Sequence, residues 1–173
     1  MSRRRWRRRR RGDRRDAVLA VVVGLVVVVA MHAGTHPAGA SPAPSGTAAA
    51  AIAYAKAQIG KPYVYGAAGP DAYDCSGLVM AAYASAGVSI ERTSEEQWAS
   101  EPHVSGPEPG DLVYFTGSPS DPPPGHVGLV VGPHLMIDAY GSGVPVQEQS
   151  FGLPDSAPGL ADPWGYTRPW GSP

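Results

Sequence analysis

Asp74-Cys75-Ser76-Gly77-Leu78-Val79 holds the only cysteine of this 173-residue chain. The apolar residues after the cysteine recur at intervals of three and four: Leu78, Val79, Ala82 and Ala86. This spacing predicts an amphipathic helix that begins at Cys75, is capped by Asp74 and ends at Gly87. A thiolate in a first helical turn faces unpaired N–H groups and the positive end of the helix dipole, so Cys75 is a candidate nucleophile. The alternative is a cysteine that packs as a small apolar side chain.

Residues 1–40 have the pattern of an export signal. Ten of the 14 Lys and Arg residues lie between Arg3 and Arg15, an apolar run covers Ala17 to Ala33, and small residues end at Ala38-Gly39-Ala40. This order predicts a secretory signal peptide that is removed before Ser41. The Arg-rich start also permits a twin-arginine route. An uncleaved anchor is the alternative, since about 17 apolar residues is the lower limit for a membrane span.

Charge and cysteine usage narrow the class of protein. After Asp16 the chain has four basic and thirteen acidic side chains, so its body is acidic and has no basic surface for nucleic acid. Exported small domains usually use cysteines in disulfide pairs, so a lone exported thiol needs another reason, and catalysis, burial and intermolecular pairing stay open. No His, Cys and carboxylate cluster has metal-ligand spacing, so we expect neither a metal nor an organic cofactor.

The sequence after the signal predicts one domain. Residues 41–47 are Pro-, Ala-, Ser- and Gly-rich and predict a flexible lead-in, and residues 48–173 form the domain with a Pro/Gly-rich tail. Besides the helix from Cys75, we expect helices over Ala48–Ile59 and from Thr93 or Ser94 to Ser100, with Ser94 and Gln97 at capping-box spacing. Four β-rich runs follow: Leu112–Phe115, Val127–Val131, Leu135–Tyr140 and Val144–Gln149. Helices followed by consecutive antiparallel strands predict an α+β fold.

His126 is the histidine best placed for chemistry. His103 and His134 stand beside prolines in expected loops, where solvated side chains are the rule. His126 instead opens an apolar strand whose alternation places His126 and Gly128 on the same face. A group on the neighbouring strand could orient its imidazole.

Asp138 is that group if the hairpin register is right. A Gly132-Pro133-His134 loop pairs Val131 with Leu135, which places Asp138 diagonally across from His126 at about 7–8 Å between backbones. A shift by one residue would turn Asp138 to the other face. Cys, His and Asp in this arrangement are the parts of an activated thiol nucleophile.

Five segments resemble, in order, the signature segments of the NlpC-type cell-wall peptidases: Pro62-Tyr63-Val64-Tyr65-Gly66, Tyr73-Asp74-Cys75-Ser76-Gly77-Leu78-Val79, Arg92-Thr93-Ser94, Pro109-Gly110-Asp111-Leu112-Val113-Tyr114-Phe115 and Gly125-His126-Val127-Gly128-Leu129. The resemblance spans about Ala50 to Gln149 and implies a papain-like α+β domain. It also implies a secreted thiol peptidase that hydrolyses the bond between D-γ-glutamate and a diamino acid in bacterial peptidoglycan stem peptides. We expect a monomer in the extracellular cell-wall space that meets the membrane only through its signal segment.

The same resemblance implies roles for six residues. Cys75 corresponds to the nucleophile, His126 to the general base and Asp138 to the third, orienting member. Tyr63 corresponds to a position near the thiolate and the oxyanion site. Two further positions, Asp74 and Ser76, correspond to residues that hold the free amino end of the substrate.

The chain departs from the family pattern in a few places. The third member is often His and is Asp138 here, while Tyr65 and Tyr73 stand where Trp and Phe are more usual. The Pro-rich loop from Gly117 to Pro124 forms either one lip of the cleft or a surface insertion. Two other functions stay open: amide or acyl transfer on a different exported substrate, and a non-catalytic binding domain.

Overall fold

The computed structural model describes residues 45–117 and 123–171. The expected signal peptide, its cleavage point and most of the lead-in lie outside these residues, as does most of the Gly117–Pro124 loop. Those expectations stay predictions.

Three helices come first along the described chain. They are α2 (Gly46–Ala57), α3 (Cys75–Ser85) and α4 (Ser94–Ser100). Their N-caps are Ser45, Asp74 and Thr93, and each accepts a hydrogen bond from a backbone N–H of the first turn, which would otherwise be unpaired. The predicted cap and start of α3 are confirmed.

Two details of the helices differ from expectation. The capping box of α4 joins Thr93 to Glu96, rather than Ser94 to Gln97, because Ser94 is already inside the helix. Helix α2 begins two residues before the expected start and ends at Ala57. Ile59 therefore lies in the turn after the helix and is 46% exposed, and the buried face of α2 consists of alanines.

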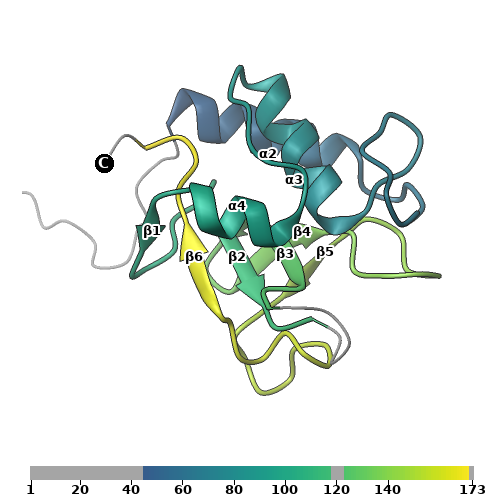
Figure 1. The fold of residues 1–173 in the computed structure, drawn as a ribbon. Coiled ribbons are helices and arrows are strands. Elements are labelled where there is room, and N and C mark those ends of the chain that lie inside the picture. The colour runs from purple at the N-terminus through teal and green to yellow at the C-terminus, as the bar shows by residue number, and fades with distance from the viewer. Residues whose placement is uncertain (1–44, 118–122, 172–173) are drawn as a thin grey trace, which may run out of the picture. The chain divides into compact units, whose positions relative to one another are not determined.

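Six antiparallel strands form one sheet in the order β1-β6-β2-β3-β4-β5. The strands are β1 (His103–Val104), β2 (Leu112–Phe115), β3 (His126–Gly132), β4 (Leu135–Asp138), β5 (Gln147–Ser150) and β6 (Gly165–Thr167). The four expected strands are present: β2 has the predicted bounds, and β3, β4 and β5 have shifted ends. The short β1 and β6 were not predicted, and β6 brings the C-terminal tail back beside β2 (Figure 1).

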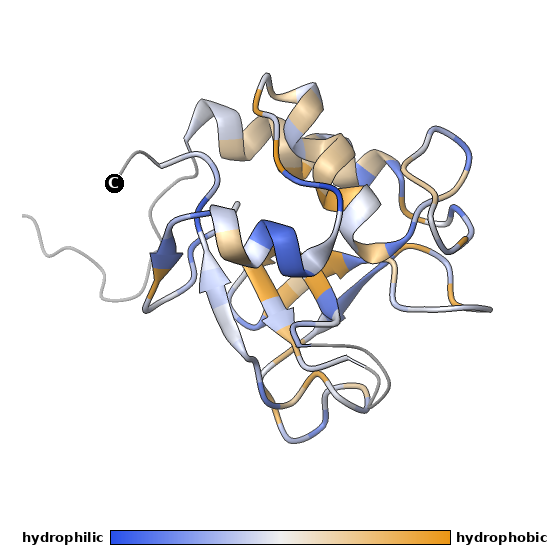
Figure 2. Cartoon of the chain, in the orientation of Figure 1, coloured by the Kyte–Doolittle hydropathy of each residue, from blue (hydrophilic) through white to orange (hydrophobic). Residues whose placement is uncertain are grey.

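The sheet buries apolar side chains on both faces. Leu112, Tyr114 and Leu129 belong to the main core, which they share with α2 and α3. Alternate residues of β2 and β3 face a second core that contains Phe115 and Phe151. Figure 1 shows α2 and α3 stacked over the sheet, and Figure 2 shows hydrophobic residues along the inner strands. Both faces are covered, so the predicted α+β fold is confirmed.

The β3–β4 hairpin has the predicted register, but its turn differs from the predicted one. Leu129 pairs with Ile137 and Val130 with Met136, as expected. The turn contains two residues rather than three, because Gly132 pairs with Leu135. A bulge between Val130 and Gly132 absorbs the extra residue, so Asp138 stays on the same face as His126.

No helix within the described residues is both long enough and apolar enough to cross a bilayer.

Candidate active site

Cys75 is the first residue of α3 and lies at the junction of two surface pockets. It is partly exposed, and its sulfur is not in a disulfide. The loop before it packs tightly on the helix, because a Cβ on Gly77 would lie 2.2 Å from the carbonyl oxygen of Ala67. The thiol is therefore accessible on a helix start that the preceding loop holds in place.

His126, the first residue of β3, forms the expected contact with Asp138. Its Nε2–H donates to Asp138 Oδ2 at 2.8 Å, and Asp138 is fully buried. Cys75 lines the same pocket as His126, and its side chain is near enough to the imidazole to raise the pKa of the ring. Since Nε2 is used by Asp138, Nδ1 is the ring nitrogen available to the sulfur. The structure thus brings the three predicted residues together in the order thiol, imidazole and carboxylate.

The surroundings favour a charged imidazole. Burial of the ring lowers the pKa of His126, but the hydrogen bonds to Asp138 and Cys75 and the negative charges of both partners outweigh burial and raise the pKa to about 10. The site therefore stabilises a protonated imidazole at neutral pH.

Asp138 has a second partner that sequence reasoning missed. Gln149 of β5 donates from Nε2 to Asp138 Oδ1 at 2.7 Å. Both carboxylate oxygens are therefore oriented, one by His126 and one by Gln149. Little in the sequence indicated this role for Gln149, because Gln is common on exposed edge strands.

The pocket on the His126 side is lined mainly by rings. This aromatic pocket, about 340 Å³, is bounded by Cys75, Phe115, His126, Tyr140, Pro158 and Leu160. The Phe115 and Tyr140 rings flank the imidazole with centroids 5.9 Å and 5.6 Å away. Gly117 and Gly125, the described ends of the β2–β3 loop, also line it.

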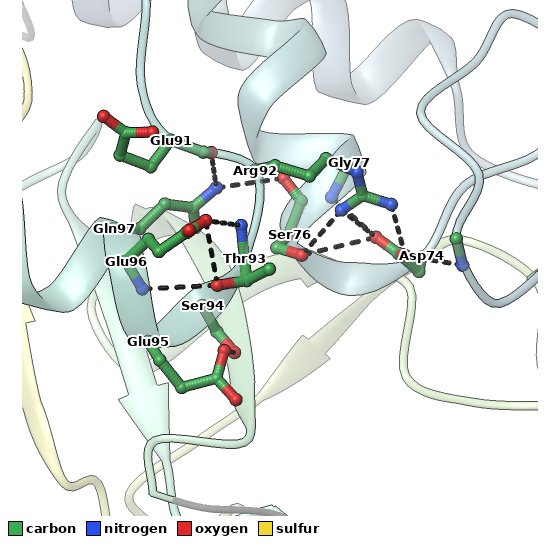
Figure 3. Close-up of polar contacts among 11 residues, drawn as sticks. Asp74, Ser76, Gly77, Glu91, Arg92, Thr93, Ser94, Glu95, Glu96 and Gln97 are labelled. Carbon is green, nitrogen blue, oxygen red and sulfur yellow. Dashed lines mark hydrogen bonds and ion pairs between the residues drawn. The ribbon is translucent and has the colours of Figure 1, made fainter.

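The second pocket beside Cys75 contains three charged side chains. This polar pocket, about 470 Å³, is bounded by Tyr65, Asp74, Cys75, Ser76, Arg92 and Glu95. Arg92 binds Asp74 through both guanidinium ends, at 3.1 Å to Oδ1 and 2.6 Å to Oδ2, and donates to Ser76 Oγ at 3.0 Å (Figure 3). The hydrogen bonds to Asp74 raise the pKa of Arg92, against the opposing effect of burial.

The Asp74 carboxylate already has several donors. Oδ1 accepts from the Gly77 N–H at 2.7 Å and Oδ2 from the Gly66 N–H at 2.8 Å, in addition to Arg92. Asp74 is thus the cap of α3 and the anchor of Arg92, and its side chain is only 8% exposed. Arg92 was recognised in the sequence as part of a motif but not as a site residue.

Gln97 of α4 fastens the Arg92 segment to α3. Its Nε2 donates to the carbonyl oxygens of Ser76 and Glu91, and the side chain is fully buried (Figure 3). Helix α4 therefore supports the polar pocket from behind.

Tyr63 lines both pockets beside Cys75, as its predicted place near the thiolate requires. Its backbone bridges to Tyr73, which fixes the strand-like segment before the Cys75 loop.

The remaining histidines lie elsewhere. His103 is exposed and stacks on Trp98 with ring centroids 4.0 Å apart. His134 is in the β3–β4 turn, where its Nδ1 contacts the Phe151 carbonyl oxygen. Over residues 45–117 and 123–171, no three His, Cys, Asp or Glu side chains are grouped to hold a metal ion.

Comparison with known proteins gives consistent matches. A "Probable endopeptidase" of Corynebacterium glutamicum is 42% identical over 116 residues, which cover 66% of this chain and 53% of that protein. The chain thus spans about half the length of this relative. The structure of NlpC2 from Trichomonas vaginalis matches with a TM-score of 0.65 and 27% identity, covering 76% of this chain and 49% of that one.

A third match is the structure of the peptidoglycan hydrolase RipB from Mycobacterium tuberculosis. Its TM-score is 0.55 and its identity 30%, over 70% of this chain and 64% of that chain. The model of the NlpC/P60 family matches residues 60–155, more than half of the chain and the whole region between the Cys75 loop and β5. The chain therefore belongs to the NlpC/P60 family.

Proposed function

We propose that this chain is a secreted cysteine endopeptidase that hydrolyses the bond between D-γ-glutamate and a diamino acid in peptidoglycan stem peptides. The observation that carries the proposal is the His126 imidazole, which has Asp138 on Nε2 at 2.8 Å and lines one pocket together with Cys75. Membership of the NlpC/P60 family and likeness to a peptidoglycan hydrolase support the same reaction class. Cys75 is the proposed nucleophile, His126 the acid and base, and Asp138 the orienting group.

The reaction proceeds by acyl transfer. The Cys75 thiolate attacks the scissile carbonyl carbon, and the carbon–nitrogen bond breaks as the His126 imidazolium gives its proton to the leaving amine. A water molecule then attacks the thioester, with neutral His126 taking its proton, and the glutamyl acid leaves as the Cys75 thiolate and the imidazolium are restored. The Cys75 N–H and Tyr63 are the proposed partners of the oxyanion.

The polar pocket is the proposed site of the glutamyl side of the substrate. Asp74 is bound by Arg92 and two backbone N–H groups, so it contributes mainly by fixing Arg92. Glu95 lines the same pocket and accepts only from its neighbour Ser94 among the described residues. Ser76 and Glu95 are therefore the groups that we assign to a free amino end, with Asp74 behind them.

The direct test uses defined stem peptides and mass analysis of the products. The wild-type protein is expected to release the diamino acid, and Cys75→Ala to release none while keeping its circular dichroism. His126→Ala is expected to lose at least about 100-fold in kcat/KM. The exposed His103→Ala is the matched control and is expected to retain full activity, since His103 contacts only Trp98 and the sheet edge.

Three outcomes contradict the proposal. Cleavage by Cys75→Ala would remove the assigned nucleophile, and hydrolysis at another bond would favour an amidase or acyltransferase of the same fold. Absence of products, together with slow reaction of Cys75 with a thiol probe, would favour a binding domain without catalysis.

Glu95 is tested with the same peptides carrying a free or an acetylated amino end. Glu95→Gln is expected to lose about tenfold on the free amine only. An equal loss on both peptides would remove the assignment of the amino end to Glu95.

A further inference from the structure

The aromatic pocket has a wall that lies beyond the region shared with the family model. The family match ends at residue 155, whereas Pro158, Gly159 and Leu160 line the same pocket as Cys75 and His126. These three residues belong to a loop that the chain closes on itself, because the Gly152 N–H donates to the Leu160 carbonyl oxygen at 2.8 Å.

Two contacts hold this wall against the sheet. The Leu160 side chain is buried in the second core with Phe115 and Phe151. On the cleft side, the Tyr140 hydroxyl donates to the Pro158 carbonyl oxygen. Pro158 itself is exposed, so the Tyr140 bond fixes the part of the wall that faces the pocket.

Tyr140 also contacts the proposed general acid. Its ring meets the His126 ring edge-on with centroids 5.6 Å apart. A single side chain thus connects the imidazole to the Pro158–Leu160 wall. Because Tyr140 follows β4 by two residues, its position depends on the same hairpin register that places Asp138.

The chemistry of acyl transfer identifies which part of the substrate occupies this pocket. The group that protonates the leaving amine must lie on the leaving side of the scissile bond. His126 lines the aromatic pocket and does not line the polar pocket. The leaving residue therefore enters the aromatic pocket, and the acyl side extends toward Arg92.

The lining of the aromatic pocket selects the kind of side chain that fits. Apart from the reacting residues Cys75 and His126, none of the described residues that line it carries a charge, in contrast to the three charged residues of the polar pocket. Rings, a proline and a leucine bind methylene groups well and bind charges poorly.

We propose that Tyr140 is a specificity-determining residue, which holds Pro158–Leu160 as a wall against which the aliphatic chain of the leaving residue packs. The charged ends of that residue then reach solvent. The inference rests on the proposed peptidase function and adds to it a subsite for the leaving group.

Two peptides that share L-alanyl-γ-D-glutamate and differ in the leaving residue test the proposal. With L-lysine as the leaving residue the chain has four methylenes, and with glycine it has none. The wild-type protein is expected to prefer the lysine peptide by at least about tenfold in kcat/KM. Tyr140→Phe removes only the hydroxyl and is expected to reduce that preference to below about threefold, mainly by raising KM for the lysine peptide.

Tyr166→Phe is the matched control. Tyr166 packs against the same second core but does not line the aromatic pocket, so its variant is expected to keep the wild-type preference. Equal cleavage of both peptides by the wild-type protein would overturn the subsite, as would a Tyr140→Phe variant that loses activity on both peptides by the same factor. Failure of the peptidase proposal is distinguished from these outcomes, because the wild-type protein would then cleave neither peptide.

Discussion

The two pockets beside Cys75 are built in different ways. In the polar pocket, Arg92, Asp74 and Ser76 are joined by directional hydrogen bonds that exist before any substrate arrives. In the aromatic pocket, His126 is surrounded by rings, and its wall is held by packing and one hydroxyl. The polar pocket is therefore expected to respond to charge changes and salt, and the aromatic pocket to changes in shape.

Helix α3 on one side of the thiol and strands β3 and β4 on the other contribute different parts of the site. Helix α3 and its cap fix the sulfur, and the strands β3 and β4 supply the imidazole and the carboxylate. A substitution on one side should therefore leave the other largely intact, which makes the comparison testable one side at a time.

The largest expected effect is that of Asp138→Asn on the aromatic side. An amide keeps the size of the side chain but removes the negative charge that His126 contacts at 2.8 Å. We expect kcat to fall at least about 100-fold, because the imidazolium loses its orienting partner. Steady-state kinetics on the defined peptide measure this, and a loss below about threefold would contradict the role of Asp138.

The same variant has a predicted pH dependence. In the wild-type protein, the imidazolium is expected to persist until the pH rises through the His126 pKa of about 10. Loss of the Asp138 charge lowers that pKa, so the alkaline limb of the rate profile should move down by about 1–3 pH units.

The free energy of unfolding is expected to depend on pH in the same direction as the rate. The folded pKa of His126 lies above the ordinary value of 6.5, so the stabilisation from the protonated ring is complete below about pH 6.5 and is lost as the pH approaches 10. Asp138→Asn should weaken this dependence, which denaturant titrations at several pH values would measure. An unchanged slope would argue against stabilisation of the imidazolium by Asp138.

A smaller effect is expected when the ion pair of the polar pocket is broken. Arg92→Gln leaves Asp74, which is 8% exposed, without its cation, and we expect KM to rise about tenfold with kcat changed less than about threefold. The guanidinium is 36% exposed, so solvent screening limits the loss of stability to about 1 kcal/mol.

Asp74→Asn serves as the companion variant for this pair. Asn caps helices about as well as Asp, so the start of α3 is expected to survive while the charge is removed. The double variant should then be less damaged than the sum of the single ones. A loss in the double variant equal to the sum of the losses in the two single variants would show that the ion pair does not act as a unit.

Much of this arrangement was predictable because it is local in the sequence. The helix start at Cys75, the Asp74 cap and the strand that begins with His126 each follow from spacing within a few residues. The contact between His126 and Asp138 was predictable from alternation across one hairpin, although the turn is one residue shorter than expected.

The parts that were missed depend on distant segments. β6 pairs with β2 across more than 50 residues, and its three residues show no strand pattern of their own. Arg92 and Gln149 reach the site through tertiary packing, which periodicity does not report. The same reason explains why the Pro158–Leu160 wall had no signal beyond a Pro/Gly-rich composition.

Gly128→Ala probes the packing between His126 and Asp138. A Cβ at this position would lie 2.5 Å from Met136 Sδ and 3.5 Å from Asp138 Cβ, so the methionine must move. We expect a loss of about 1–2 kcal/mol in the free energy of unfolding, measured by denaturant titration. Gly141→Ala is the control, because a Cβ there meets nothing within 4 Å, and an equal effect of both variants would exclude crowding as the cause.

The smallest effect is expected at the rim of the polar pocket. Tyr65 lines this pocket but is 89% exposed, so Tyr65→Ala should change the free energy of unfolding by less than about 0.5 kcal/mol. KM is expected to rise about two- to fivefold, because a large rigid side chain at a rim adds contact area at little entropic cost. Val64→Ala is the control, since Val64 is 50% exposed, adjacent in the chain and absent from the pocket lining. If Tyr65→Ala and Val64→Ala change KM equally, the rim does not contact the substrate, and recognition on this side falls to Glu95 and the Arg92 network.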